Sequence, residues 1–269
     1  GQKFMKRTDL ACEIASDNQH FEGIELKEYN IGSVGVSHII ISKDGEKSTG
    51  RPKGTYITLH CRRRDRYDEV RAVAQVLSGM VPDGDILAAG FGNCDITPDS
   101  LGTRTVRRIA ATAHLAAHND FAALGMRKVY AVEAGVTGRT GIESTDSIEL
   151  AVRHVKPQAV IVIDSLACAE ADRLCSTIQI TDTGITPGSG VGNDRKGVNQ
   201  SALKVPVIAI GVPTVIDLDT ISPERTEKFM VTPRDIDGVI THYAEVLAEA
   251  LNSVLNPTLT ADELEQLIV

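Results

Sequence analysis

The sequence predicts an α/β protein of three layers, in which a mostly parallel, doubly wound sheet carries helices on both faces. Two observations support this fold class. Apolar runs without alternation, such as 160–163 and 205–211, are typical of strands that are buried on both faces. Stretches with apolar residues at helical spacing lie between and after such runs, at 67–80, 144–154 and 235–255. Strands that alternate with helices in this way favour a parallel sheet with crossover helices.

The elements follow one another along a single predicted α/β domain. Residues up to about 35 are polar and weakly periodic and are expected to be a flexible arm. Strands are expected at 34–41, 55–60, 86–93, 128–133, 160–167, 178–180 (an edge strand) and 205–211. Helices are expected at 67–80, 101–118, 144–154, 169–174, 235–255 and in the tail after 257, and the segment 42–54 is expected to be turns.

Composition excludes several classes of protein. The 269 residues are 42% hydrophobic and carry a net charge of -8, so a basic nucleic-acid surface is not expected. The five cysteines are odd in number and scattered, which favours a reducing compartment over a disulfide scaffold. No apolar run is long enough to span a membrane and no signal peptide is evident. These observations predict a cytoplasmic protein that contacts neither membrane nor nucleic acid.

Two carboxylates follow two predicted buried strands. Asp164 ends the run 160–163, and Asp99 lies in the loop that leaves the strand beginning at Ile86. Because parallel strands end at one edge of the sheet, where α/β proteins place their ligands, we expect both acids to meet there. A simpler interpretation of Asp99 is that it caps the helix expected at 101–118.

A pair of acids without an obvious metal set or nucleophile suggests the activation of water. Two close carboxyl groups share one proton, so one can take a proton from water while the other polarises a carbonyl group. The hydroxyl groups of Thr97, Ser100 and Ser165 are near enough in sequence to hydrogen-bond the pair. A serine nucleophile is disfavoured because Gly-x-Ser-x-Gly is absent around Ser165. No cofactor is expected.

Two other kinds of site remain open. His114 and His118 are four residues apart, but no glutamate follows His114 as a zinc peptidase motif requires. The glycine-rich segment 182–193 resembles a phosphate loop but lacks the lysine of a Walker motif. We interpret it as a rigid loop in which Gly188, Gly190 and Gly192 let the backbone of a peptide substrate approach closely.

Several motifs together resemble a known family, the germination protease of spore-forming bacteria. They are Arg7–Ala11, Gly92-Asn93 with Thr97–Gly102, Gly135–Glu143, Ile163–Ala167, Pro187–Asn193, Val212–Val215 and Met230–Pro233. Each motif alone is weak, but the combination extends over nearly the whole chain.

The resemblance implies an atypical aspartic endopeptidase that degrades small acid-soluble spore proteins in the cytoplasm of the forespore and the spore core. Its two essential aspartates match Asp99 and Asp164. It further implies a homotetramer made as a zymogen, whose own cleavage site matches Asp9-Leu10 because the family cuts before a Leu or Phe followed by Ala, with an acid on either side. The resemblance thus implies a propeptide-like arm, residues 1–9, before a single α/β peptidase domain, residues 10–269.

The sequence departs from the family at one place and also resembles another family. Members of the germination protease family carry a long insertion where only ten residues separate Asp219 from Met230 here. Gly92-Asn93 with a downstream acid also resembles the hydrogenase-maturation peptidases, which use a metal and add a histidine ligand that segment 181–220 does not offer. A metal-dependent peptidase of that type and a non-enzymatic nucleotide-binding module therefore stand as alternatives.

Overall fold

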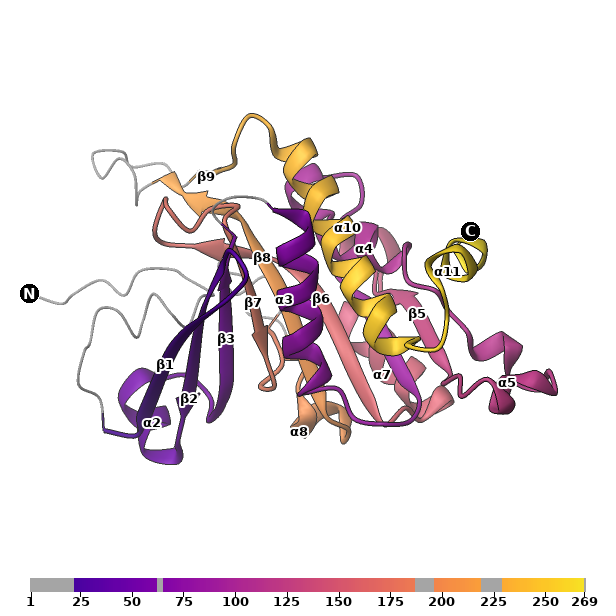
Figure 1. The fold of residues 1–269 in the computed structure, drawn as a ribbon. Coiled ribbons are helices and arrows are strands. Elements are labelled where there is room, and N and C mark those ends of the chain that lie inside the picture. The colour runs from indigo at the N-terminus through magenta and orange to yellow at the C-terminus, as the bar shows by residue number, and fades with distance from the viewer. Residues whose placement is uncertain (1–21, 62–64, 187–195, 219–228, 269) are drawn as a thin grey trace, which may run out of the picture.

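The computed structural model describes residues 22–61, 65–186, 196–218 and 229–268. Within these residues, nine strands form one mixed sheet in the order β1-β2-β3-β7-β8-β6-β4-β5, and β9 pairs with β8 off this path. Helices lie on both faces of the sheet, and α3 and α10 lie in front of it in Figure 1. The predicted three-layer α/β fold is confirmed.

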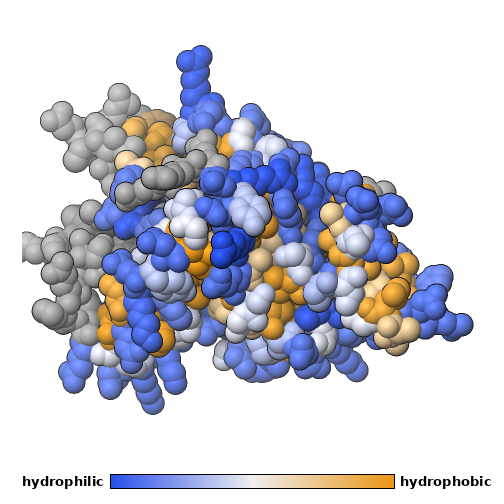
Figure 2. Space-filling model, in the orientation of Figure 1, coloured by the Kyte–Doolittle hydropathy of each residue, from blue (hydrophilic) through white to orange (hydrophobic). Residues whose placement is uncertain are grey.

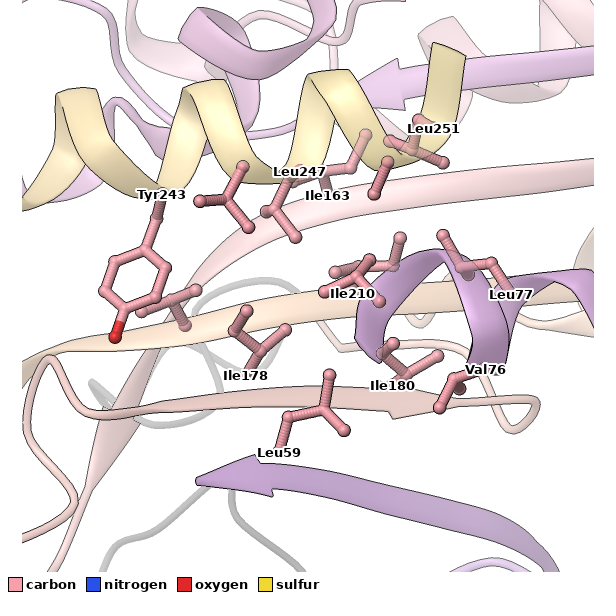
Figure 3. Close-up of a cluster of buried hydrophobic side chains, with 14 of the residues drawn as sticks. Leu59, Val76, Leu77, Ile163, Ile178, Ile180, Ile210, Tyr243, Leu247 and Leu251 are labelled. Carbon is pink, nitrogen blue, oxygen red and sulfur yellow. The ribbon is translucent and has the colours of Figure 1, made fainter. Parts of the chain in front are cut away.

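One helix layer consists of α3 (Arg66–Ser78), α4 (Leu101–Val106) and α10 (Ile236–Leu255), and the other of α7 (Ser144–Val155) and α8 (Gln200–Leu203). Tyr243, Leu247 and Leu251 of α10 recur at helical spacing and point into the core toward the sheet (Figure 3). The outer surface of this layer carries mostly hydrophilic side chains (Figure 2). The helices α3, α7 and α10 confirm those expected at 67–80, 144–154 and 235–255.

The remaining helical elements are short. They are α2 (Lys43–Thr49), η1 (Thr97–Asp99), η2 (Ala113–Ala117), α5 (Asp120–Ala123), α6 (Thr137–Thr140) and α11 (Ala261–Leu267). The last of these is the helix expected in the tail.

Four strands form the parallel half of the sheet. In sheet order they are β5 (Val129–Glu133), β4 (Ile86–Gly90), β6 (Ala159–Cys168) and β8 (Val207–Asp217). Ile161 and Ile163 of β6 belong to the core cluster that contains α10, whereas Val160 and Val162 belong to the cluster that contains α7. Both faces of β6 are covered, which is why its sequence does not alternate.

The other half of the sheet is antiparallel. It continues from β8 through β7 (Thr177–Thr181), β3 (Gly54–His60), β2 (Val34–Ile41) and β1 (Ile24–Ile31), while β9 (Met230–Val231) pairs with the end of β8. In β7, Ile178 and Ile180 face the core below α10, so Gln179 and Thr181 face the opposite side. This face is therefore polar at β7, whereas farther along it Ile39, Ile41 and Tyr56 form an apolar cluster with Leu166 and Cys168.

Four short segments differ from the prediction. The part of the expected arm at 24–31 is the edge strand β1, and the expected turns at 42–54 contain α2. The expected helix at 169–174 is instead a series of turns, with bonds such as Arg173 N–H to the Glu170 carbonyl. β7, expected at an edge, lies between β3 and β8 because the chain continues the sheet beyond it.

The expected helix at 101–118 is also wrong in its extent. The α-helix ends at Val106, and η2 follows separately. The Asn252 side chain of α10 accepts a hydrogen bond from Ala110 N–H at 2.9 Å, and Thr112 N–H donates to the Val129 carbonyl at 3.0 Å. These tertiary bonds take the place of helical ones, so the chain leaves the helix.

A membrane-spanning helix is not found among the described residues, since none of their helices combines the necessary length and apolarity.

Candidate active site

A cavity of about 690 Å³ lies beside the carboxyl-terminal halves of β6 and β8. Asp99 of η1 and Asp164 of β6 both line it. This end of the sheet is at the upper left of Figure 1, where β9 pairs with the end of β8. The structure thus brings the two acids of the sequence prediction to one cavity, at the edge where the parallel strands end.

Asp164 is placed by the regular geometry of β6. It continues the row of Val160 and Val162 along the α7 face of the strand, and only 7% of its surface is exposed. The backbone N–H of Ser165 donates to Asp164 Oδ1 at 2.8 Å. The residue opposite it on β8 is Gly211, which has no side chain to fill the cavity.

Asp99 is placed by a turn. It ends the single 3₁₀ turn η1, and its Oδ2 accepts a hydrogen bond from Asn93 N–H at 2.8 Å. The N-cap position of α4 belongs to Ser100, whose side chain makes no cap hydrogen bond. The simpler interpretation of Asp99 as a helix cap is therefore wrong. Its carboxylate binds the loop that leaves β4 instead.

Two glycines allow this turn to pack closely against the sheet. Gly92 has a φ of +99°, and a Cβ there would lie 1.9 Å from the Asp99 carbonyl oxygen. A Cβ on Gly102 would lie 2.2 Å from the Ile163 carbonyl oxygen of β6. A side chain at either position would push η1 and α4 away from the strand that carries Asp164, so the two glycines permit the approach of the two acids.

Two of the three predicted hydroxyl partners, those of Ser100 and Ser165, do not bind the acids. Ser100 Oγ donates to the Thr97 carbonyl at 2.8 Å, which closes the turn rather than binding an acid. Ser165 Oγ is buried and has no hydrogen-bond partner among the described residues, so Ser165 serves Asp164 through its backbone N–H. The prediction that these two hydroxyl groups bind the pair is wrong.

The far wall of the cavity comes from the antiparallel half. Gln179 and Thr181 of β7 form part of its floor, and Arg51 and Tyr56 lie at its β3 end. Tyr56 is buried, and its hydroxyl donates to the Pro52 carbonyl at 2.8 Å. Burial raises the pKa of Tyr56, and a hydrogen bond with Thr183 and the nearby charge of Arg51 oppose that rise. Among the described residues that line the cavity, Arg51 is the one basic side chain.

Sequence reasoning did not assign Arg51 or Gln179 to the site. Both come from the antiparallel half, whose position beside β8 is a property of the sheet order and has no local signal in the sequence. The polar residues of β7 alternate with Ile178 and Ile180, and that alternation was the available sign that one strand face is polar.

Five predicted site residues are not placed by the structure. Asp9, Leu10, Gly188, Gly190 and Gly192 lie outside the described residues. On either side of the glycine segment, however, Thr186 and Asn199 line the cavity. Closer to the cavity, Ile185 and Val198 exchange backbone hydrogen bonds of 2.9 and 2.7 Å, so the two ends of this segment are paired next to the site.

The side-chain atoms at the cavity that could bind a metal ion are carboxylate, amide and hydroxyl oxygens. In the part of the chain that the structure describes, no group of three or more His, Cys, Asp or Glu side chains is arranged to hold a metal ion. His114 lies in η2 and His118 follows its end, so the two do not share a face of one α-helix as the spacing alone would allow.

Comparison with known proteins gives the family. The sequence profile described as germination protease matches residues 3–229. The chain belongs to the germination protease family. Membership makes it a peptidase with a role in spore germination, as the sequence resemblance implied.

Individual germination proteases are similar over most of the chain. The protein from Caldanaerobacter subterraneus subsp. tengcongensis is 36% identical over 320 residues, covering 97% of this chain and 98% of its own. That from Oceanobacillus iheyensis is 38% identical over 263 residues, covering 89% of this chain and 69% of its own. The first alignment is longer than the 269 residues of this chain, so this relative has residues that the chain lacks.

Among solved structures, a NiFe hydrogenase maturation protease, HycI from Thermococcus kodakarensis KOD1, aligns with a TM-score of 0.43 and 19% identity. The alignment covers 67% of this chain and 98% of the HycI chain.

Proposed function

We propose that this germination protease is an aspartic endopeptidase in which Asp99 and Asp164 activate water. The observation that carries the proposal is their common position: one acid from a turn and one from a buried strand line the same cavity. Each carboxylate accepts a backbone N–H, from Asn93 and Ser165 respectively, so both side chains are held in place. Two carboxyl groups held at one cavity can share a proton when they lie close together.

The reaction needs one proton shared between the two acids. The ionised carboxylate takes a proton from water as the water oxygen bonds to the carbonyl carbon of the peptide, and the protonated acid gives its proton to the carbonyl oxygen. The tetrahedral intermediate then breaks its carbon–nitrogen bond as the nitrogen receives a proton from one acid, while one of its two hydroxyl groups returns a proton to the other acid and becomes the carbonyl of the new carboxyl group, so that the pair again holds one proton. No other reactant than water is consumed.

The cavity also supports acidic proteins as substrates. It extends from β6 past β8 and β7 to the loop before β3, which is three strand spacings, or about 14 Å. An extended peptide covers this length with about four residues. Arg51 lies at the far end, so it is placed to bind a substrate carboxylate about four residues from the bond that is cut. Small acid-soluble spore proteins in the cytoplasm of the spore core are the substrates we propose.

Asparagine variants test the proposal directly. Asp99→Asn and Asp164→Asn each remove a proton-accepting group while keeping the size of the side chain. Each is expected to lower kcat on a small acid-soluble spore protein by about a thousandfold or more, with the fold intact by circular dichroism. Asp95→Asn is the matched control, because Asp95 lies in the same loop but is exposed and pairs with Arg139 at 3.0 Å. Full cleavage by both site variants would overturn the mechanism.

Chelation separates this mechanism from the metal-dependent alternative. Cleavage is expected to persist after incubation with excess EDTA and desalting. Loss of activity that returns on addition of zinc or nickel would favour a metal peptidase instead.

We further propose that the chain is a homotetramer made as a zymogen that cuts its own Asp9-Leu10 bond. The support for this is the family resemblance and the sequence Asp9-Leu10-Ala11 itself. Incubating the protein alone and sequencing the new amino terminus is expected to give Leu10. A terminus elsewhere, or none, would contradict self-cleavage at this bond, and light scattering measures the assembly.

A further inference from the structure

Strand β8 carries an extra residue where it passes the cavity. Pro213 pairs with Leu166 of β6 and Val215 pairs with Ala167, so Thr214 has no register partner on β6. An extra residue of this kind is a β-bulge, which bends a strand and turns a side chain in a new direction. Pro213 suits the position, because proline cannot donate to the hydrogen-bond ladder and in central strands occurs mainly at bulges.

The bulge exchanges the two faces of β8. Val212 belongs to the core cluster that contains α10, whereas Ile216 belongs to the cluster of Leu166 and Cys168 on the other face. Residues four apart in a regular strand face the same side. The single extra residue therefore accounts for the change.

The side chain that the bulge redirects binds the turn that carries Asp99. Thr214 is fully buried, and its hydroxyl donates to the Pro98 carbonyl at 2.7 Å. That carbonyl and the Asp99 N–H belong to one planar peptide unit. The N–H donates to the Ile96 carbonyl at 2.8 Å, so the peptide from which Asp99 projects is held at both ends.

The bulge is itself held from the opposite side. Its Thr214 carbonyl accepts a hydrogen bond from the hydroxyl of Thr232 at 2.7 Å. Thr232 directly follows β9, which pairs with the end of β8. A continuous series of bonds thus connects β9, the bulge and η1.

We propose that Thr214 is a positioning residue, which holds the Asp99 carboxyl group in place relative to Asp164. The proposal rests on the catalytic role proposed for that pair. β8 is the neighbour of β6, so the bulge anchors Asp99 on the strand beside the one that carries Asp164. The sheet, together with the loop that leaves β4, then determines the distance between the two acids.

The test compares Thr214→Val, Thr214→Ser and Thr112→Val. Valine keeps the shape of threonine but leaves the Pro98 carbonyl without its donor, and serine restores the donor. Thr112 is the control, because it is also fully buried and its hydroxyl donates to the Arg127 carbonyl at 2.6 Å, but it does not line the cavity. Each variant is assayed for kcat, KM, thermal midpoint and the pH dependence of kcat.

Thr214→Val is expected to lower kcat by about tenfold to a hundredfold with little change in KM, since small misplacements of reacting groups have costs of this order. Thr214→Ser is expected to recover most of the loss, and Thr112→Val to lower the thermal midpoint alone. Asp99, Asp164 and Arg51 are the charged side chains among the described residues lining the cavity. If Asp99 is held less firmly, the two acids interact less strongly and their two titration steps move closer together. The fall of kcat on the alkaline side of its pH profile should therefore move to lower pH.

Three outcomes would overturn the inference: unchanged kcat in folded Thr214→Val, an unmoved alkaline limb, or equal losses in the valine and serine variants. If Thr214→Val does not fold, Thr232→Val carries the test, because it removes only the donor to the bulge carbonyl and is expected to cause a smaller change of the same kind. Failure of the catalytic pair itself is distinguishable, because Asp99→Asn and Asp164→Asn would then remain active.

Discussion

The parallel and antiparallel halves of the sheet contribute differently to the site. The parallel strands β4, β6 and β8 are covered on both faces, and their ends supply Asp164, the loop to Asp99 and the Thr214 bulge. The antiparallel strands supply the far wall of the cavity, through the polar Gln179 and Thr181 of β7 and through Tyr56 of β3, which belongs to an apolar cluster. This difference suggests that the parallel half performs the chemistry and the antiparallel half binds the substrate, because only closely held groups can share a proton.

Among the tests of this comparison, the largest effect is expected from a change in the close packing of the parallel half. Gly92→Ala places a Cβ at a φ of +99° and 1.9 Å from the Asp99 carbonyl oxygen, so η1 must move. We expect kcat to fall by about a hundredfold, and the backbone strain to reduce stability by about 1–3 kcal/mol. Steady-state kinetics and urea unfolding measure the two effects.

Gly138→Ala is the control for this variant, because nothing lies within 4 Å of a Cβ there. If Gly92→Ala cleaved substrate as fast as Gly138→Ala, the close approach of η1 to the sheet would not matter for the reaction.

A smaller effect tests the antiparallel half as a binding surface. Arg51→Gln removes the one positive charge among the described cavity-lining residues. A partly solvated charged hydrogen bond of about 1.4 kcal/mol corresponds to a tenfold change, which we expect in KM with little change in kcat. Two peptides that differ only by Glu or Gln about four residues from the cut bond complete a double-mutant cycle.

The arginine variant should lose its preference for the Glu peptide, while Arg153→Gln, an exposed change on α7, should keep it. If Arg51→Gln lowered kcat and left KM unchanged, Arg51 would belong to the chemistry, and the distinction between the two halves would not hold.

The smallest effect concerns the connection between the antiparallel half and α3. Asp68 of α3 accepts a hydrogen bond from Ser33 N–H at 2.7 Å, in the turn between β1 and β2. The Ser33 side chain and backbone lower the pKa of Asp68 below its ordinary 3.8. A carboxylate with a lowered pKa stabilises the fold above its ordinary value, and this stabilisation is lost as pH falls through the lowered one.

Asp68→Asn is therefore expected to lower the unfolding midpoint slightly near about pH 7, with the difference from the native protein shrinking toward about pH 3. Asp44→Asn, at an exposed pair with Lys47, provides the comparison. A difference that stayed constant through the acid range would exclude the charge of Asp68 as its cause.

The errors in the sequence prediction also separate the two halves. The strands at Ile86 and Val160 were predictable because burial on both faces requires continuous apolar residues. β1 was missed because an exposed edge strand needs no such pattern, although its two-residue connection Gly32-Ser33 to β2 is typical of a hairpin. Local patterns therefore describe a strand only as far as its environment constrains each side chain.

For this protein, the sequence alone determined the fold class, the family and the expectation that Asp99 and Asp164 lie at one edge, because each follows a strongly apolar strand. Only the tertiary structure decided how Asp99 is held and which residues face the two acids across the cavity. Pro213 was visible in the sequence, but the Thr214 bond to the Pro98 carbonyl joins residues 116 positions apart. Such contacts depend on strand order and register, which arise when distant segments pack together and have no local signal.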